Sequence, residues 1–256
     1  MTGTSPNAMR YLAAKNAVDQ WNDVAGYCTQ RFAQGTIRAA QAEYVAASLG
    51  ASLGQSVSLS HAQLDGVTHL DLDAHTLGSM ALAEDRAGFV TEILAARKVV
   101  NANLSVSDEH KTTGQLLFSL SQASKDPREK VYDVRGILAH PEMMTDSTTG
   151  LAAPTIAVAE ITCAREEIDA ISDTSRSADT NVTNTDTSGN TGNTKTSDTN
   201  EHTTDTDTTN TGNTTLLSNE SNEHAQTLRT LAALVSSRIA RAFSYGYPSF
   251  DHALFQ

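Results

Sequence analysis

The sequence predicts an all-α fold, and two observations support this class. Apolar residues recur at steps of three and four along five segments, the spacing that places them on one face of a helix. Aromatic residues make up only 5% of the chain, with a single Trp, and Ala is abundant. This composition favours helices packed through small side chains over a β-sandwich. The length of 256 residues allows one or two domains, and we expect a single helical domain over 1–256.

Five apolar stripes define the expected helices in chain order. The second helix is expected over 79–101, and the fourth begins just after Pro154, a residue suited to the first turn of a helix. The stripes are Val18, Trp21, Ala25, Cys28 and Phe32, continued after an interruption at Gly35 by Ile37, Ala40, Tyr44 and Ala47; Phe89, Ile93, Ala96 and Val100; Leu116, Leu117, Leu120 and Ala123; Ile161, Ala164, Ile168 and Ile171; and Leu228, Leu231, Val235, Ile239 and Ala242.

The segments between these helices carry turn signals. Asp126-Pro127 should end the third helix, because the residue before a proline avoids helical backbone angles. The following KVYDVRGILAHP is expected to be an extended segment or one helical turn, and EMMTDSTTGLAAP is expected to be a loop. Asn219 or Ser221 is the expected N-cap of the last helix.

A run rich in Thr, Asn and Asp separates the last two helices. From Thr183 to Thr215 there is no Ala, Val, Ile, Leu, Met, Phe, Trp, Tyr or Cys, so the run buries nothing that could repay the entropy of ordering its backbone. The apolar pattern then resumes, and one isolated helix cannot form a domain. We therefore interpret 174–222 as a long disordered loop between two antiparallel helices that pack together.

HLDLDAH at 69–75 is the motif that most resembles a catalytic or metal site. In an extended strand His69, Asp71, Asp73 and His75 would share one face and could bind a divalent metal. Such a ladder spreads its ligands over about 20 Å, however, so only neighbours could share an ion. The simpler interpretations are an amphipathic strand or a capped helix start at Thr76, and a metal-dependent enzyme is kept as an alternative.

Other signatures of chemistry are missing from the sequence. It has no P-loop, no dinucleotide-binding glycine pattern, no G-x-S-x-G and no paired C-x-x-C, so we expect no enzyme, no cofactor and no metal. Cys28 and Cys163 fall at apolar helical positions and are expected to be reduced core residues. There is no signal-peptide core and no apolar stretch of membrane-spanning length, so we expect an intracellular chain without a membrane partner.

Three segments, in order, resemble coat proteins of rod-shaped plant RNA viruses, the tobamovirus-like family. The family's opening helix is similar to WNDVAGYCTQRFAQGTIRAA. Its F-P-x-x-x-x-K-V-Y strand and the helix that runs inward to the RNA resemble DPREKVYDVRGILAHP and PTIAVAEITCAREEIDAISD. Its last helix and C-terminal signature resemble LRTLAALVSSRIARAFSYGYPSFDHALF, with Asp251 in place of Glu.

The resemblance implies a four-helix-bundle core whose subunits stack into a helical rod around single-stranded RNA. The partners would be other copies of the chain and the RNA, and the location would be the virion and the host cytoplasm. Residues 50–124 have no counterpart in the family and are expected to be an extra helical insertion. The run over 174–222 falls where the family has the connection that lines the central channel.

The resemblance also implies functional residues. A net charge of −12 argues against diffuse attraction to nucleic acid, but a few arginines repeated in every subunit can hold an RNA backbone. Solvated helix residues are the alternative interpretation of all these positions. The expected RNA contacts are Arg165, Arg229 and Arg38, and the expected inter-subunit carboxylates, whose mutual repulsion would raise their proton affinity, are Glu166, Glu167, Asp169 and Asp173. A helical binding or regulatory module with a disordered acidic loop is the second alternative.

Overall fold

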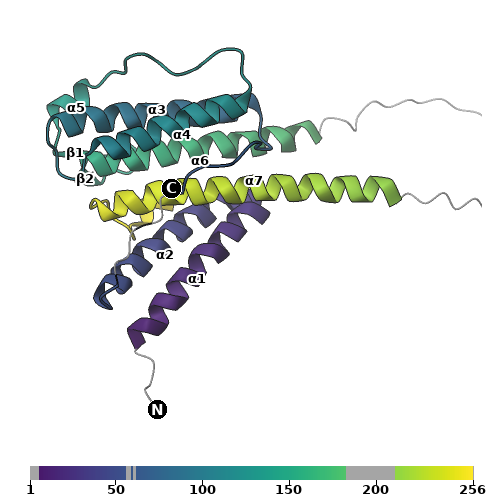
Figure 1. Cartoon of the computed structure of the whole chain (residues 1–256), viewed down its shortest axis with the longest axis horizontal. Helices are drawn as coiled ribbons and strands as arrows, with labels where there is room; N and C mark the ends of the chain where they lie inside the picture. The colour runs from purple at the N-terminus through teal and green to yellow at the C-terminus, as the bar shows by residue number, and fades with distance from the viewer. Residues whose placement is uncertain (1–5, 56–58, 60–61, 183–210, 256) are drawn as a thin grey trace, which may run out of the picture.

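The structure, a computed structural model, describes residues 6–55, 59, 62–182 and 211–255, and it confirms the all-α prediction. Figure 1 shows long helices with one short β-hairpin. The elements are α1 (Pro6–Tyr27), α2 (Phe32–Ser52), α3 (Ala74–Ala96), α4 (Leu104–Ser121), α5 (Arg135–Ala139), β1 (Met143–Thr145), β2 (Ala152–Pro154), α6 (Thr155–Val182) and α7 (Thr211–Ser244), with 3-10 turns η1 (Thr29–Arg31) and η2 (His252–Phe255).

Helices α6 and α7 lie side by side and run in opposite directions (Figure 1). Their apolar stripes face a common core, in which Ile161, Ile171, Leu231 and Val235 are buried. Burying each such side chain contributes roughly 1.5–3 kcal/mol, so the two stripes hold the pair together. The interpretation of these two helices as an antiparallel pair is confirmed.

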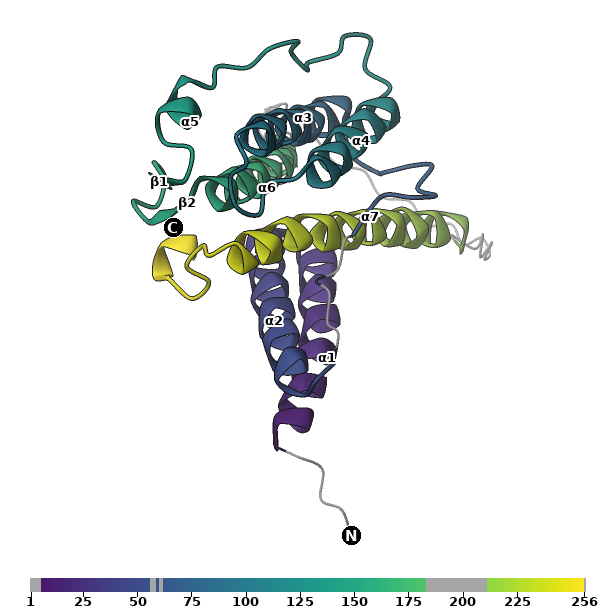
Figure 2. The same ribbon diagram turned by 60° about the vertical axis from the view of Figure 1, so that its left-hand side comes forward.

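Helices α3 and α4 complete a four-helix bundle with α6 and α7 (Figure 2). They come from residues 50–124, the range expected to be an insertion, yet Leu77, Met80 and Leu117 belong to the same core cluster as α6 and α7. The side chain of Asp73 caps the N-terminus of α3 by accepting hydrogen bonds from the backbone N–H groups of His75 and Thr76. This range therefore forms part of the central core.

The hairpin of α1 and α2 packs against the opposite side of α7, where both helices project away from the bundle (Figure 2). The two helices approach closely at Gly35, where an added Cβ would lie 2.8 Å from the backbone N of Ala25 and the backbone O of Trp21. Gly35 was expected to interrupt a helix. It lies inside α2 instead, and its missing side chain lets α1 come close at this point.

Several boundaries differ from those expected. The segment expected to be a loop before Pro154 contains the β-hairpin, in which Met144 pairs with Ala153. Helix α7 begins at Thr211, so neither Asn219 nor Ser221 is its N-cap. Both α6 and α7 extend into the range 174–222, and the rest of the expected disordered loop, 183–210, lies outside the described residues.

Candidate functional site

A cluster of charged and polar side chains lies inside the bundle, where apolar residues are the rule. We call it the buried polar cluster. The most exposed of its side chains retains only 4% of its surface, and the network draws one or more residues from each of α3, α4, α6 and α7. Its members are Glu84, His110, Thr113, Glu160, Cys163, Glu167, Arg238 and Arg241.

Helical spacing brings these side chains inward. On α6, Glu160, Cys163 and Glu167 stand three and four residues apart, so they share the face that looks toward α3 and α4. On α7, Arg238 and Arg241 are three residues apart and share one face in the same way. Polar residues thus replace apolar ones along the inner stripes of both helices.

Glu84 stands at the centre of the network. Its Oε1 accepts a hydrogen bond from Arg238 Nε at 3.0 Å and pairs with Arg238 Nη2 at 2.9 Å, while its Oε2 contacts Nδ1 of His110. Arg238 Nη2 also donates to Thr113 Oγ1 at 3.2 Å. The carboxylate is therefore held from both sides, by α7 and by α4.

The second half of the network surrounds Glu160. Its Oε1 lies 3.3 Å from Nε2 of His110 and 3.4 Å from Nη1 of Arg241. Arg241 Nη2 in turn pairs with Oε2 of Glu109 at 2.6 Å. His110 thus bridges two carboxylates, one on each side of its ring.

The neighbouring charges set the protonation of these groups. Burial alone would raise the pKa of Glu84, but the charges of Arg238 and His110 outweigh it and hold that pKa below its ordinary value. The pKa of Glu160 falls to about 2 against the same burial, mainly through His110 and Arg241. Burial disfavours the imidazolium, yet Glu160 and Glu84 raise the pKa of His110. The neighbouring charges therefore favour the ionised forms of both carboxylates and of the imidazole, while burial opposes all three.

Glu167 is the exception in this network. Burial, and then the nearby charge of Glu84, raise its pKa well above the ordinary value. Among the described residues neither of its carboxylate oxygens has a hydrogen-bond partner. The same holds for Oε2 of Glu160 and Nη1 of Arg238. Buried polar atoms usually find partners, so these four atoms mark the place where the network is incomplete.

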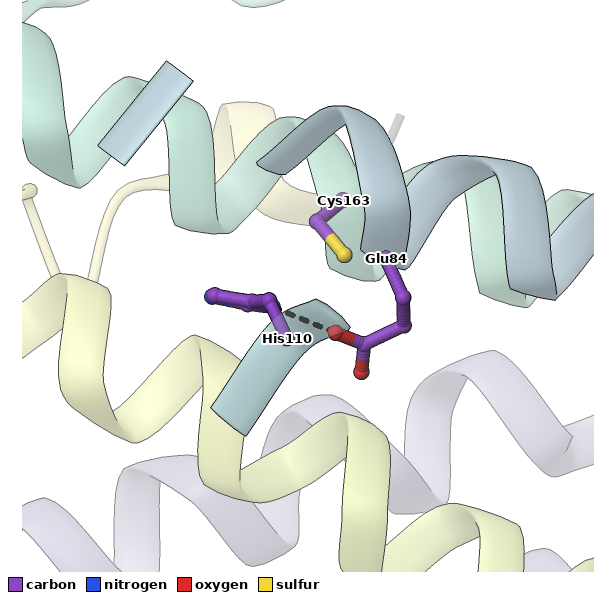
Figure 3. A group of neighbouring side chains, drawn as sticks. All are labelled: Glu84, His110 and Cys163. Carbon is purple, nitrogen blue, oxygen red and sulfur yellow. Dashed lines mark hydrogen bonds and ion pairs between the residues drawn. The ribbon is translucent and has the colours of Figure 1, made fainter. Parts of the chain in front are cut away.

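Three ligand-type side chains, those of Glu84, His110 and Cys163, converge inside the bundle (Figure 3). One ligand atom from each of Glu84, His110 and Cys163 lies within 4.8 Å of the others. In Figure 3 the sulfur of Cys163 points toward the space between the imidazole ring and the carboxylate. Within the described residues this is the one group of His, Cys, Asp and Glu side chains compact enough to share a metal ion.

The arginines expected to contact RNA lie on three different helices, each with its own partner. Arg165 on α6 pairs with the buried Asp146 at 2.9 Å. Arg229 on α7 pairs with Asp23 at 2.7 Å, and Arg38 on α2 donates to Oε1 of Gln41 at 3.0 Å. Each of the three guanidinium groups is therefore held by a different polar side chain of this chain.

Arg165 borders a groove of about 520 Å³ between α2, α6 and the C-terminal segment. Its apolar lining includes Ile37 and Ile161. Gln30, in the turn η1, and Gln34, at the start of α2, also line it. Arg165 also lowers the pKa of Asp146 to about 2 against the effect of burial, together with the hydroxyl of Tyr247. This ion pair fixes the guanidinium at the edge of the groove.

The four expected inter-subunit carboxylates divide into two groups. Glu166, Asp169 and Asp173 border one open hollow, and burial raises the pKa of Glu166 even though it pairs with Arg86 at 2.5 Å. Glu167 is fully buried inside the chain, so the expectation that it faces another subunit is wrong. The cause is its place on the inner face of α6, one turn after Cys163.

The HLDLDAH motif begins α3 and does not form a strand. Asp73 is the N-cap of α3, which confirms the expectation of a capped helix start, with Ala74 as the first helical residue. Asp71 pairs with Nδ1 of His224 at 3.2 Å. Among the described residues, His69, Asp71, Asp73 and His75 do not form a compact group of three or more ligands that could share an ion.

The two cysteines are both free. Cys163 is buried as expected, and burial raises the pKa of its thiol well above the ordinary value. Cys28 is exposed, so its assignment to the core is wrong: α1 ends at Tyr27, and Cys28 lies in the connection to η1, off the apolar face of the helix.

Comparisons of this chain with protein-family models, with curated proteins and with solved structures find no match. The likeness to rod-forming coat proteins therefore rests on the sequence segments quoted above. None of the helices in the described part of the chain combines the length and the apolar character needed to cross a membrane.

Proposed function

We propose that this chain is a structural coat protein that self-assembles into a helical rod around single-stranded RNA. The observation that carries the proposal is the antiparallel pair of α6 and α7, which are the last two segments of the resemblance in chain order. A coat subunit of this kind needs these helices to run side by side, with their connection at one end of the subunit. In Figure 1, α6 ends and α7 begins at the same end of the molecule.

Exposed apolar side chains support assembly. Met9 and Leu12, near the start of α1, keep 62% and 61% of their surface exposed. Val100, in the turn after α3, and Leu104, the first residue of α4, keep 71% and 60%. These two regions belong to different parts of the chain, so a contact between them would join unlike surfaces of two copies. Contacts of this type continue from copy to copy and produce a filament unless the rotation closes a ring.

The groove beside Arg165 supports an RNA contact. Single-stranded nucleic acids are held by cationic grooves, usually with aromatic side chains on which the bases stack. This groove offers the cationic group of Arg165 and an aliphatic lining, with Asp169 also at its wall. Arg38 and Arg229 add cationic groups on α2 and α7. With a net charge of −12, each subunit can contact only a few phosphates, and the binding strength comes from repetition along the rod.

Assembly is tested by sedimentation velocity of the purified chain over a range of concentrations. The wild type is expected to form large species, and Leu12→Lys is expected to shift them toward the monomer because it places a charge in the apolar contact. Gln115→Lys on the exposed face of α4 adds the same charge elsewhere and should behave as the wild type. A wild type that remains monomeric at every concentration would refute self-assembly.

RNA binding is tested by the salt dependence of the affinity for a single-stranded RNA. The double variant Arg38→Gln, Arg229→Gln should flatten the slope of log K against log salt by about 0.7 for each phosphate that the protein no longer neutralises. Arg135→Gln removes an arginine that is 89% exposed and paired with Asp133, and it should leave the slope unchanged. Equal slopes for all three proteins would refute the assignment of these arginines.

A helical binding module is the second candidate, and the groove beside Arg165 favours it. Its volume of about 520 Å³ lies within the roughly 300–1,000 Å³ typical of ligand sites. This candidate predicts a chain that stays monomeric with and without RNA and binds a smaller ligand between α2 and α6. The sedimentation experiment separates it from the coat protein.

A further inference from the structure

We propose that Glu84, His110, Cys163 and Glu167 bind one Zn²⁺ ion inside the bundle, at a closed structural site. The site is independent of the proposed coat function, since it concerns what holds α3, α4 and α6 together within one subunit. Its four ligands come from these three helices.

The donor set matches zinc. Structural zinc sites are four-coordinate and use thiolate sulfur, imidazole nitrogen and carboxylate oxygen. Glu84, His110 and Cys163 supply one of each, with all three ligand atoms within 4.8 Å of one another. A thiolate ligand disfavours the hard cations Mg²⁺ and Ca²⁺, which prefer oxygen donors.

The atoms around these ligands have the arrangement that orients metal-binding side chains. A ligating histidine usually directs its second ring nitrogen to a carboxylate, and Nε2 of His110 lies 3.3 Å from Oε1 of Glu160. Oε1 of Glu84 is held by Arg238 at 2.9–3.0 Å, which leaves Oε2 directed at the site. The nitrogen Nδ1 of His110 and the oxygen Oε2 of Glu84 contact each other in the metal-free chain. Zinc would replace the proton between them, take both atoms as ligands and leave the imidazole neutral.

Glu167 supplies the independent observation. Its side chain is fully buried, and neither carboxylate oxygen has a partner among the described residues. It follows Cys163 by four residues on α6, so both side chains project from the same face. After burial, the charges of Glu84 and Glu167 both raise the pKa of the Cys163 thiol, which indicates that both carboxylates lie near its sulfur. The compact group of three ligands does not include Glu167, so its carboxylate would turn toward a cation bound there and gain the partner that it lacks.

The formal charges also balance. The ion and its ligands carry a net charge of −1, because two carboxylates and one thiolate outweigh the +2 of zinc and the imidazole is neutral. The guanidinium of Arg238, which is hydrogen-bonded to Glu84, compensates this charge. Buried charges are tolerated when they are paired in this way. Beside the site, Arg241 pairs with both Glu160 and the partly exposed Glu109.

A pocket between α3 and α6 reaches one of the ligands. It has a volume of about 140 Å³, and Cys163 lies in its wall together with Ala83, Ala87 and Thr162. Once bound, the ion would be enclosed, since the side chains of its ligands are at most 2% exposed. With four protein ligands and no open position, the ion would stabilise the fold and would not activate water.

The test uses the full chain, stripped with a chelator, dialysed and titrated with ZnCl2 against a chromophoric competitor. We expect one Zn²⁺ per chain, a higher melting temperature with zinc, and, with Co²⁺ in its place, a thiolate-to-metal charge-transfer band. Cys163→Ser should abolish that band and weaken zinc binding at least about 100-fold, whereas Cys28→Ser, at the exposed free cysteine, should change neither.

Two further variants separate ligation from general loss of structure. Glu167→Gln should weaken zinc binding in a chain that still shows the wild-type circular dichroism, and Glu166→Gln, at the half-buried neighbour, should not. Glu160→Gln, acting through His110, should weaken binding about 10–100-fold. The proposal is overturned if the folded wild type takes up no zinc, or if Cys163→Ser and Glu167→Gln bind it as tightly as the wild type. Neither result would affect the test of assembly.

Discussion

Replacing Arg238 by Met should be among the most destabilising single changes to this chain. The side chain is fully buried and makes two contacts with Glu84, at 3.0 and 2.9 Å, and one with Thr113 at 3.2 Å. Met fills much of the same volume, but it leaves the carboxylate of Glu84 in the core without its guanidinium. Removing one partner of a buried ion pair costs about 3–5 kcal/mol. For a chain of this size that corresponds to a fall in melting temperature of roughly 6–20 °C.

Chemical unfolding in urea, followed by circular dichroism in the presence of a chelator, measures this cost. Arg229→Met is the matched control, since Arg229 lies on the same helix and pairs with Asp23 at 2.7 Å, but its side chain is 40% exposed. Exposed pairs contribute about 0–1 kcal/mol, so this variant should resemble the wild type. Equal and small losses in both variants would show that Arg238 does not hold Glu84 in the interior, and the account of the buried polar cluster would fail.

Three further outcomes are expected. Gly35→Ala should destabilise the chain by about 1–3 kcal/mol in urea unfolding because its Cβ would meet α1 backbone atoms at 2.8 Å, whereas Gly136→Ala, which meets nothing within 4 Å, should not; equal losses would contradict the close contact. Asp73→Ala should lower the unfolding free energy by about 0.5–2 kcal/mol through loss of the α3 N-cap, and Asp73→Asn should restore most of it; an equal loss in both would argue against capping. The pKa of Glu167 is raised above its ordinary 4.5, so the metal-free folded chain keeps a proton there that the unfolded chain loses as pH rises. This group's contribution to stability is therefore present at low pH, and it declines as pH rises from about 4.5 through the folded-state pKa. Glu167→Gln should therefore remove a slope of up to about 1.4 kcal/mol per pH unit in chelator, and an unchanged pH profile would refute the raised pKa.

The helices that local patterns define were predictable from the sequence. The stripes that begin at Val18, Ile161 and Leu228 place α1, α6 and α7, because the period of a helix is local and does not depend on distant residues. Pro154 marks the start of α6 within one residue. The packing of α6 on α7 followed because two apolar faces in one chain need a common partner surface.

The buried polar cluster could not be predicted in this way. Glu84 and Arg238 are 154 residues apart in sequence, and each alone resembles a solvated charge on a helix. A weak signal was present in SSRIAR, where the arginines interrupt the apolar stripe of α7 between Val235 and Ala242. Which carboxylates they meet is decided by how α3 and α4 pack on α6, and that contact has no local pattern.

Cys28 shows the opposite error. It continues the apolar stripe of α1 by spacing, but the helix ends at Tyr27, one residue before it. Spacing alone does not show where a helix stops when neither Gly nor Pro follows directly. A one-residue error in a boundary was enough to move a side chain from the predicted core to the surface.

The proposal that this chain coats single-stranded RNA as a helical rod is tested most directly by electron microscopy of the purified protein mixed with two RNAs of different length. The account predicts rods of constant diameter whose length increases in proportion to the RNA. Particles that are absent, or whose length is the same with both RNAs, would contradict it.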